Sequence, residues 1–202
     1  MIKYILAALA CGGAVGYVNN AYGSAEVGGF VSSYLYSFLL VLLLFTMGFV
    51  FGADREALVK LKKAGLKILV VPFSIALGSI TGGLVGGYIL GLNIVGSMAV
   101  CAGFGWYTMA GPLVGELFGP SFEALGFTVN FMREILTIVT APLLVKVDRY
   151  SPIAFGGATT MDTTLPVVTR YCGSESLIAA FSSGFTLSIA APFAITTIAA
   201  LQ

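Results

Sequence analysis

Residues 30–53, FVSSYLYSFLLVLLLFTMGFVFGA, form an apolar run that contains no charged side chain. A run of roughly 20 such residues is long enough to cross the hydrocarbon core of a bilayer as a helix. The rest of the chain has the same character, since 58% of its 202 residues are hydrophobic and only 9% are charged. A soluble domain carries about 25% charged residues, so this chain has too little polar surface to cover a water-soluble globule. The sequence therefore predicts an all-α, polytopic membrane protein.

About five apolar segments are long enough to be full membrane spans. They are Ile2–Val18, Phe30–Ala53, Leu66–Leu92, Phe122–Val145 and Ser176–Leu201. We treat 1–202 as one transmembrane transport domain, in which 1–65 hold the first two spans and a basic loop, and 66–202 hold the core. The start of the chain also has features of a signal peptide, with Lys3 before an apolar run. The membrane character of everything that follows favours a first span that is retained.

Two further apolar segments, 94–120 and 152–168, are interrupted in the middle by Gly, Thr and Pro. Unpaired backbone groups are costly in lipid, so irregular backbone at membrane depth occurs only inside protein or beside a water-filled cavity. Two interrupted segments in one chain are typical of a transporter binding site, and they are compatible with an inverted repeat.

The loop after the second span is rich in Lys and Arg between Arg55 and Lys67. This predicts a cytoplasmic loop and, from it, a cytoplasmic N-terminus. Two paths of the interrupted segments remain open. If both are re-entrant and enter from opposite sides, Lys146, Arg149 and Arg170 also face the cytoplasm; if both cross the membrane, Lys146 and Arg149 face outward. The charge distribution favours the re-entrant path.

The span 122–145 carries polar residues on one helical stripe, among them Glu123, Asn130 and Glu134. A carboxylate at mid-helix costs about 2.5–3.5 kcal/mol on insertion, so Glu134 should face the interior of the bundle. The adjacent Arg133 projects about 100° away from Glu134 around the helix. Two interpretations remain: Glu134 lines a substrate or proton path, or Arg133 and Glu134 are both ion-paired structural residues. Glu123 is expected nearer the membrane surface.

The stretch GGATTMDTTLP, 156–166, places Asp162 among threonines that include Thr160 and Thr163. Its glycines and Pro166 should keep the backbone from closing a regular helix. A carboxylate surrounded by hydroxyls and free carbonyls predicts a site for a small cation or a protonated amine. The alternative is local, since Asp162 could simply cap the half-helix after the break.

The stretch GFGWYTMAG is the counterpart in the first interrupted segment. Gly103 and Gly105 would expose backbone groups there. Trp106 and Tyr107 could cover the aliphatic part of a substrate or stack on a cation. Aromatic residues also anchor helices at membrane interfaces, but the flanking glycines favour the binding-site interpretation.

Several classes of function receive no support from the sequence. The net charge of +1 gives no bulk signal for nucleic acid, and there is no histidine. Cys11, Cys101 and Cys172 lack metal-ligand spacing and are expected to be packing residues. Because no nucleophile–base set or phosphate loop is present, we expect no enzymatic activity, no cofactor and no metal site. Proton chemistry would then fall to carboxylates, tyrosine or lysine.

The stretches AGFGWYTMAGPLVGELFGP, FMREIL and GGATTMDTTLPVV, in this order, resemble the lysine exporter LysO family of bacterial and archaeal inner-membrane proteins. LLLFTMGFVFG and the basic loop after it extend the resemblance over essentially the whole chain. The resemblance implies export of L-lysine, and of analogues such as thialysine, in exchange for protons. It also implies a role for intramembrane acids, which Glu134 fits best and Asp162 next.

Typical members of that family are longer, with about three further spans before the region that matches Met1. The resemblance therefore implies a separately encoded small membrane subunit that supplies them. Two other functions remain open: an inorganic-cation/proton antiporter, or a non-transporting subunit of a two-chain exporter. A homo-oligomer is a further open alternative.

Overall fold

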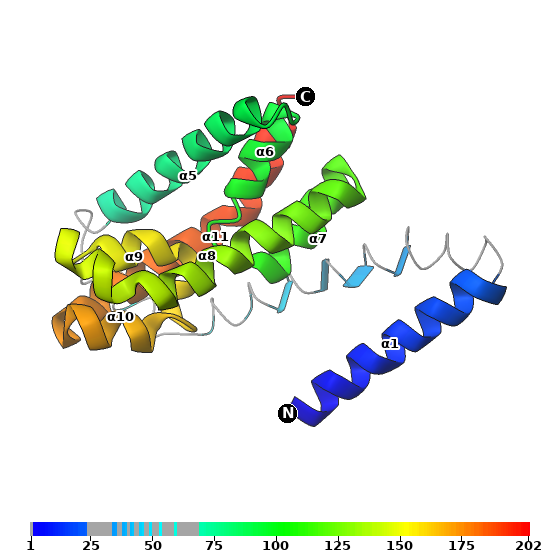
Figure 1. The fold of residues 1–202 in the computed structure, drawn as a ribbon, viewed down its shortest axis with the longest axis horizontal. Helices are drawn as coiled ribbons and strands as arrows, with labels where there is room; N and C mark the ends of the chain where they lie inside the picture. The colour runs from blue at the N-terminus through cyan, green and yellow to red at the C-terminus, as the bar shows by residue number, and fades with distance from the viewer. Residues whose placement is uncertain are drawn as a thin grey trace. The chain divides into compact units, whose positions relative to one another are not determined.

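The computed structural model describes residues 2–23, 34–35, 38–39, 41–42, 45–46, 49, 53, 59 and 69–202 (Figure 1). By internal contacts the chain divides into two units, Met1–Phe45 and Thr46–Gln202. The first unit contains α1 (Ile2–Tyr22), which covers the first predicted span. Most of the predicted second span, 30–53, and of the basic loop lies outside the described residues. The regular structure of the described residues is helical throughout, which confirms the all-α prediction.

Three helices of the described part are long and apolar enough to cross a membrane. They are α5 (Val70–Ile89), α8 (Pro120–Val147) and α11 (Leu177–Ala199). Each coincides with a predicted span, with its ends shifted by a few residues. They form the frame of the second unit, consistent with a polytopic membrane protein.

The first interrupted segment is a helical hairpin, here called hairpin 1. It consists of α6 (Ile94–Cys101), an irregular turn, and α7 (Tyr107–Phe118). A Cβ atom built on Gly96, at the start of α6, would lie 3.1 Å from the ring of Phe118 at the end of α7. Hairpin 1 therefore returns to the end of the bundle at which it began.

The second interrupted segment is also a hairpin, here called hairpin 2. It consists of α9 (Ser151–Gly156), the 3-10 segment η3 (Gly157–Met161) and α10 (Leu165–Cys172). A short 3-10 turn, η4 (Ser174–Ser176), then leads into α11. Nε of Arg149, just before hairpin 2, donates to the carbonyl of Cys172 at its end, at 2.8 Å. Hairpin 2 also begins and ends together, and it extends beyond the predicted boundary at 168.

The two hairpins enter the bundle from opposite ends. Hairpin 1 follows α5 and precedes α8, whereas hairpin 2 follows α8, so the length of α8 separates their bases. The unit of α5 and hairpin 1 is thus repeated, in the opposite direction, by α8 and hairpin 2. An inverted repeat has this arrangement. This arrangement agrees with the re-entrant path, one of the two that the sequence left open.

Charged residues differ between the two ends. Lys146 closes α8, and Arg149 and Arg170 lie at the base of hairpin 2. The same end holds the start of α5, because Val70 and Asp148 line one pocket. In the described part, the opposite end carries Glu116 and Glu123 and no Lys or Arg.

Glycines bring α5 close to α6. A Cβ atom on Gly83 would lie 2.6 Å from the carbonyl oxygen of Ser97 and 2.9 Å from Cβ of Cys101. The preceding residue, Gly82, points about 100° away around the helix and has nothing within 4 Å of the same built atom. The face of α5 that carries Gly83 and Gly87 therefore packs against α6 of hairpin 1.

We expect Gly83→Val to lower the free energy of unfolding by about 1–3 kcal/mol, because the added carbons overpack the α5–α6 contact. Gly82→Val, on the open face of the same helix, is the control and should change stability much less. The unfolding midpoint of the purified protein in detergent measures both. Equal losses in the two variants would contradict the packing described for α5.

Candidate functional site

The tips of the two hairpins touch each other. At tip 1, Phe104 and Gly105 take left-handed φ angles of 52° and 106°, and at tip 2 Gly157 has a φ of 63°. These angles turn the chain back on itself, and glycine adopts them without strain. The N–H of Ala158 donates to the carbonyl of Phe104 at 2.8 Å. A Cβ atom on Gly157 would collide with that same carbonyl, so only glycine allows this approach.

Asn130, near the middle of α8, holds tip 1. Its Oδ1 accepts from the N–H of Gly105 at 2.7 Å. Its Nδ2 donates to the carbonyls of Val100 at 2.9 Å and Gly126 at 2.8 Å. The side chain is buried, and its amide joins the end of α6 to the turn. Asn130 thus stabilises the break in hairpin 1.

Arg133, one turn further along α8, holds hairpin 2. Its Nε donates to the carbonyl of Phe155 at 2.7 Å and its Nη2 to that of Ala154 at 3.0 Å. Its Nη1 donates to Oγ of Ser79 on α5 at 2.8 Å. The carbonyls lie in the last turn of α9, where a cation is favourable. Arg133 is therefore a structural residue, held by carbonyls rather than by an ion pair with a described carboxylate.

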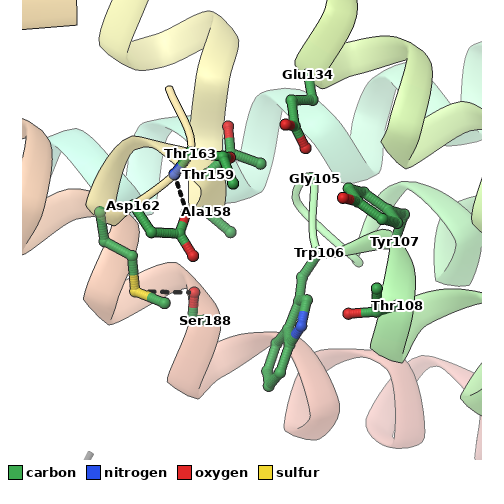
Figure 2. Close-up of a pocket in the computed structure, with 11 residues that line it drawn as sticks. Gly105, Trp106, Tyr107, Thr108, Glu134, Ala158, Thr159, Asp162, Thr163 and Ser188 are labelled. Atoms are coloured by element: carbon green, nitrogen blue, oxygen red, sulfur yellow. Dashed lines mark hydrogen bonds between the residues drawn. The ribbon is translucent and has the colours of Figure 1, made fainter. Parts of the chain in front are cut away.

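A pocket of about 210 Å³ lies where the tips meet (Figure 2). It is bounded by tip 1, tip 2, α8 and α11. Its lining residues are Gly105, Trp106, Tyr107, Thr108, Glu134, Ala158, Thr159, Met161, Asp162, Thr163 and Ser188. The two acids singled out from the sequence, one from α8 and one from tip 2, therefore share one pocket.

Glu134 reaches this pocket with an unsatisfied carboxylate. Its Oε2 atom is buried and makes no hydrogen bond. The hydroxyls of Tyr107 and Thr163 are the neighbouring groups that can donate to the carboxyl. Asp162 is close enough to interact with the same carboxyl electrostatically. A buried acceptor without a partner is costly, and a cationic or protonated ligand would satisfy it.

Asp162 lies in the irregular backbone between η3 and α10. Its Oδ1 accepts from the N–H of Thr163 at 2.6 Å, and its side chain is exposed. The residue that caps α10 is Thr164, whose side chain makes no capping hydrogen bond. Asp162 is thus not the N-cap of that half-helix, and its carboxylate is directed to the pocket (Figure 2).

Some predicted residues lie outside the pocket. The hydroxyl of Thr160 donates to the carbonyls of Gly157 at 2.7 Å and Ala180 at 2.9 Å, so it ties tip 2 to α11. Gly103 is buried against Asn130 and Ala110, and Asn130 itself serves the backbone. Their role is to shape the tips.

Two of the predicted structural residues lie at helix ends. Glu123 is in the first turn of α8, and Pro166 is in the first turn of α10. Thr159, one of the threonines around Asp162 in the sequence, also lines the pocket, together with residues that the sequence did not indicate: Thr108, Ala158, Met161 and Ser188. A hydroxyl inside the uncharged last span was the available signal for Ser188.

No group of three or more Asp, Glu or Cys side chains in the described part is arranged to hold a metal ion. The pocket's anionic groups are the two carboxylates, one aromatic wall is formed by Trp106 and Tyr107, and hydroxyls complete the lining. This combination suits an organic ammonium group with an aliphatic chain.

The model of the family described as "Lysine exporter LysO" matches residues 6–199. The chain belongs to this family. The lysine exporter LysO of Escherichia coli (strain K12) is 36% identical over 160 residues, which are 78% of this chain and 52% of that protein. A putative lysine exporter of Haemophilus influenzae is 29% identical over 157 residues, covering 77% of this chain and 79% of that protein. No solved structure matches.

The chain spans about half the length of the LysO protein of Escherichia coli. The Haemophilus relative, by contrast, is matched over similar shares of both chains, 77% and 79%, so the two have similar lengths. These matches confirm the family resemblance inferred from the sequence, and they make this chain a member of a transporter family. It is consistent with a multi-pass protein of the cell membrane.

We expect Asn130→Ala to destabilise tip 1, because the buried N–H of Gly105 would lose its partner at a cost of about 1–3 kcal/mol, and the carbonyl of Val100 would keep only the N–H of Gly103. Trp106, the single tryptophan of the chain, adjoins this tip, so its emission should shift along with a lower unfolding midpoint. Thr140→Ala is the control, since that hydroxyl bonds only within α8. An unchanged spectrum and midpoint for Asn130→Ala would show that tip 1 does not depend on this amide.

Proposed function

We propose that this protein exports L-lysine by a secondary transport mechanism in which the pocket between the hairpin tips binds the cargo. The observation that carries the proposal is the buried, unpartnered Oε2 of Glu134 in a pocket that Asp162 shares. In a membrane protein such acids mark substrate or proton pathways by default. Membership of the lysine exporter family supports lysine as the cargo.

The proposed binding mode uses both ends of the cargo. The side-chain ammonium group of lysine would lie between Glu134 and Asp162, with Trp106 and Tyr107 against its methylene groups. The carboxylate would approach the N-terminus of α7, which begins at Tyr107 beside the pocket. Helix N-termini favour anions because their first N–H groups lack partners in the helix.

Proton exchange would use the same acids. Removing a carboxyl from water disfavours its charged form, so binding of a proton and binding of the cationic cargo would alternate at Glu134. The protonated carboxyl could not hold the ammonium and would release it. Transport of close analogues such as thialysine would follow from the same contacts, since the aliphatic part meets only aromatic and backbone groups.

The orientation of the chain in the membrane follows from the charge distribution. Lys146, Arg149 and Arg170 lie at the end at which α5 starts, directly after the basic loop in the sequence. By the positive-inside rule we assign this end to the cytoplasm. Hairpin 2 would then enter from the cytoplasm and hairpin 1 from outside, and the cargo would leave between the bases of hairpin 1 and α8.

A further membrane segment should cover the pocket. Asp162 and Thr163 are exposed in the described structure, and a carboxylate facing lipid at this depth would be costly. A separately encoded small membrane subunit of about three spans is our candidate for this cover. A second copy of the chain would be the alternative.

Glu134→Gln and Asp162→Asn should each abolish lysine counterflow in proteoliposomes, because each removes a charge that holds the ammonium group. The amount of protein in the membrane should remain normal, since Gln and Asn keep the size of the acids and an oxygen that can accept their hydrogen bonds, such as the one from the N–H of Thr163 to Asp162. Glu116→Gln, outside the pocket, is the matched control and should transport normally. Normal counterflow in both pocket variants would overturn the proposal.

Lysine and Na⁺, added separately to proteoliposomes, distinguish lysine export from inorganic-cation exchange. We expect lysine to change the internal pH and Na⁺ alone to leave it unchanged. Trp106 and Tyr107 are proposed to contact the methylene groups of the cargo, and a Na⁺ ion has none. A response to Na⁺ alone would instead identify a cation/proton antiporter. The assay is run with this chain alone and together with the small subunit. If neither preparation responds to lysine or Na⁺, this chain is a non-transporting subunit.

A further inference from the structure

A second pocket of about 510 Å³ lies between α5, α8 and α9. Its lining residues are Val70, Val71, Ser74, Ile75, Gly78, Ser79, Arg133, Asp148, Tyr150, Ser151 and Ala154. We call it the Arg133 pocket. It begins at the end of the bundle that carries Lys146 and Arg149, and it reaches inward to Arg133.

The Arg133 pocket extends to the middle of the bundle. From Val70 to Ser79 the lining of α5 rises about 13 Å at the spacing of an α-helix, and Ser79 is hydrogen-bonded to Arg133. Arg133 itself lies near the middle of α8. A solute that enters from the basic end would therefore meet a guanidinium group at membrane depth.

The hairpin tips separate the two pockets. Gly105 lines the pocket of Glu134 and Asp162. A Cβ atom on Gly105 would lie 3.7 Å from Cδ of Arg133, and one on Gly157 would lie 2.9 Å from its Nη2. Arg133, which lines the second pocket, therefore lies beside both tips.

The chemistry of the Arg133 pocket favours a carboxylate. A guanidinium group has five N–H donors, and three hydrogen bonds from Arg133 to other residues are formed. No carboxylate of the described residues forms an ion pair with it, although an unpaired charge at this depth is costly. The hydroxyls of Ser74, Ser79 and Ser151 line the same space. Arginine with adjacent hydroxyls is well suited to bind a carboxylate.

The other titratable groups of this pocket are Asp148 and Tyr150, at its outer end. Oδ1 of Asp148 accepts from the N–H of Tyr150 at 2.8 Å, and the side chain is exposed. The carboxylate at the mouth would attract a cationic cargo, and the guanidinium at the floor would bind a carboxylate.

We propose that the Arg133 pocket is a loading site on the cytoplasmic side that binds the α-carboxylate of an amino acid before the hairpin tips separate. Arg133 and Ser79 bind the carboxylate. The identity of the cargo rests on the proposed function; the preference for a carboxylate rests on Arg133 itself.

Cadaverine, which is lysine without its carboxylate, tests this site directly. Both compounds compete with labelled L-lysine for the purified full chain. Arg133→Gln should lower the affinity for L-lysine by about tenfold or more, the expected loss for a hydrogen bond to a charged group. The affinity for cadaverine should stay nearly unchanged. Arg133→Lys should restore part of the preference for lysine. Arg149→Gln, a cation at the same end but outside the pocket, is the matched control.

A second variant avoids the structural role of Arg133. Gly78 lines the pocket and has nothing within 4 Å of a built Cβ atom, so Gly78→Leu should fill the pocket without disturbing the fold. It should slow loading of lysine from the basic side, whereas Gly82→Leu, which is equally unhindered, should not. An unchanged lysine-to-cadaverine ratio in Arg133→Gln, or normal loading in Gly78→Leu, would overturn the inference.

The variant Glu134→Gln tests the proposed function independently of the Arg133 pocket. This variant removes the acid that contacts the side-chain ammonium group. Lysine and cadaverine share that group, so the affinity for both compounds should fall by the same factor. If Glu134→Gln has no effect on either compound, the proposed function fails. The lysine-to-cadaverine ratio in Arg133→Gln is judged independently of that outcome.

Discussion

Two side chains in the middle of α8 hold the irregular backbone of this protein in place. Asn130 bonds the turn of hairpin 1, and Arg133 bonds the last carbonyls of α9 in hairpin 2. Backbone groups that leave a regular helix in a membrane need such partners, because lipid offers none. These hydrogen bonds stabilise the two breaks where the tips meet.

The same helix also divides the charges of the core. Arg133 and Glu134 are neighbours in sequence but project about 100° apart, so they contact different sides of the hairpin tips. The guanidinium faces α5 and α9, while the carboxyl faces Tyr107 and tip 2. A cation and an anion at one level of one helix therefore serve two separate pockets.

The sequence predicted the framework better than the roles of single residues. Long apolar runs gave the helices α5, α8 and α11, and the Gly, Thr and Pro interruptions gave the breaks, because backbone chemistry is local. The partners across the bundle were not predictable in this way. Asn130 looked like a pocket residue and is bound to backbone, and Thr160 faces α11 rather than the pocket. The Arg133 pocket was missed because it depends on how α5 and α9 pack around one side chain.

The path of hairpin 2 is the claim on which the account depends most, and sided labelling of single cysteines measures it. In a chain whose own cysteines have been replaced, Tyr150→Cys and Tyr171→Cys mark the two ends of hairpin 2, and Glu116→Cys marks the end of hairpin 1; all three positions are exposed. A membrane-impermeant maleimide should label both tyrosine positions from the same side of the membrane and Glu116→Cys from the other side. Labelling of Tyr150→Cys and Tyr171→Cys from opposite sides would show that this segment crosses the membrane, and the meeting of the two tips would be contradicted.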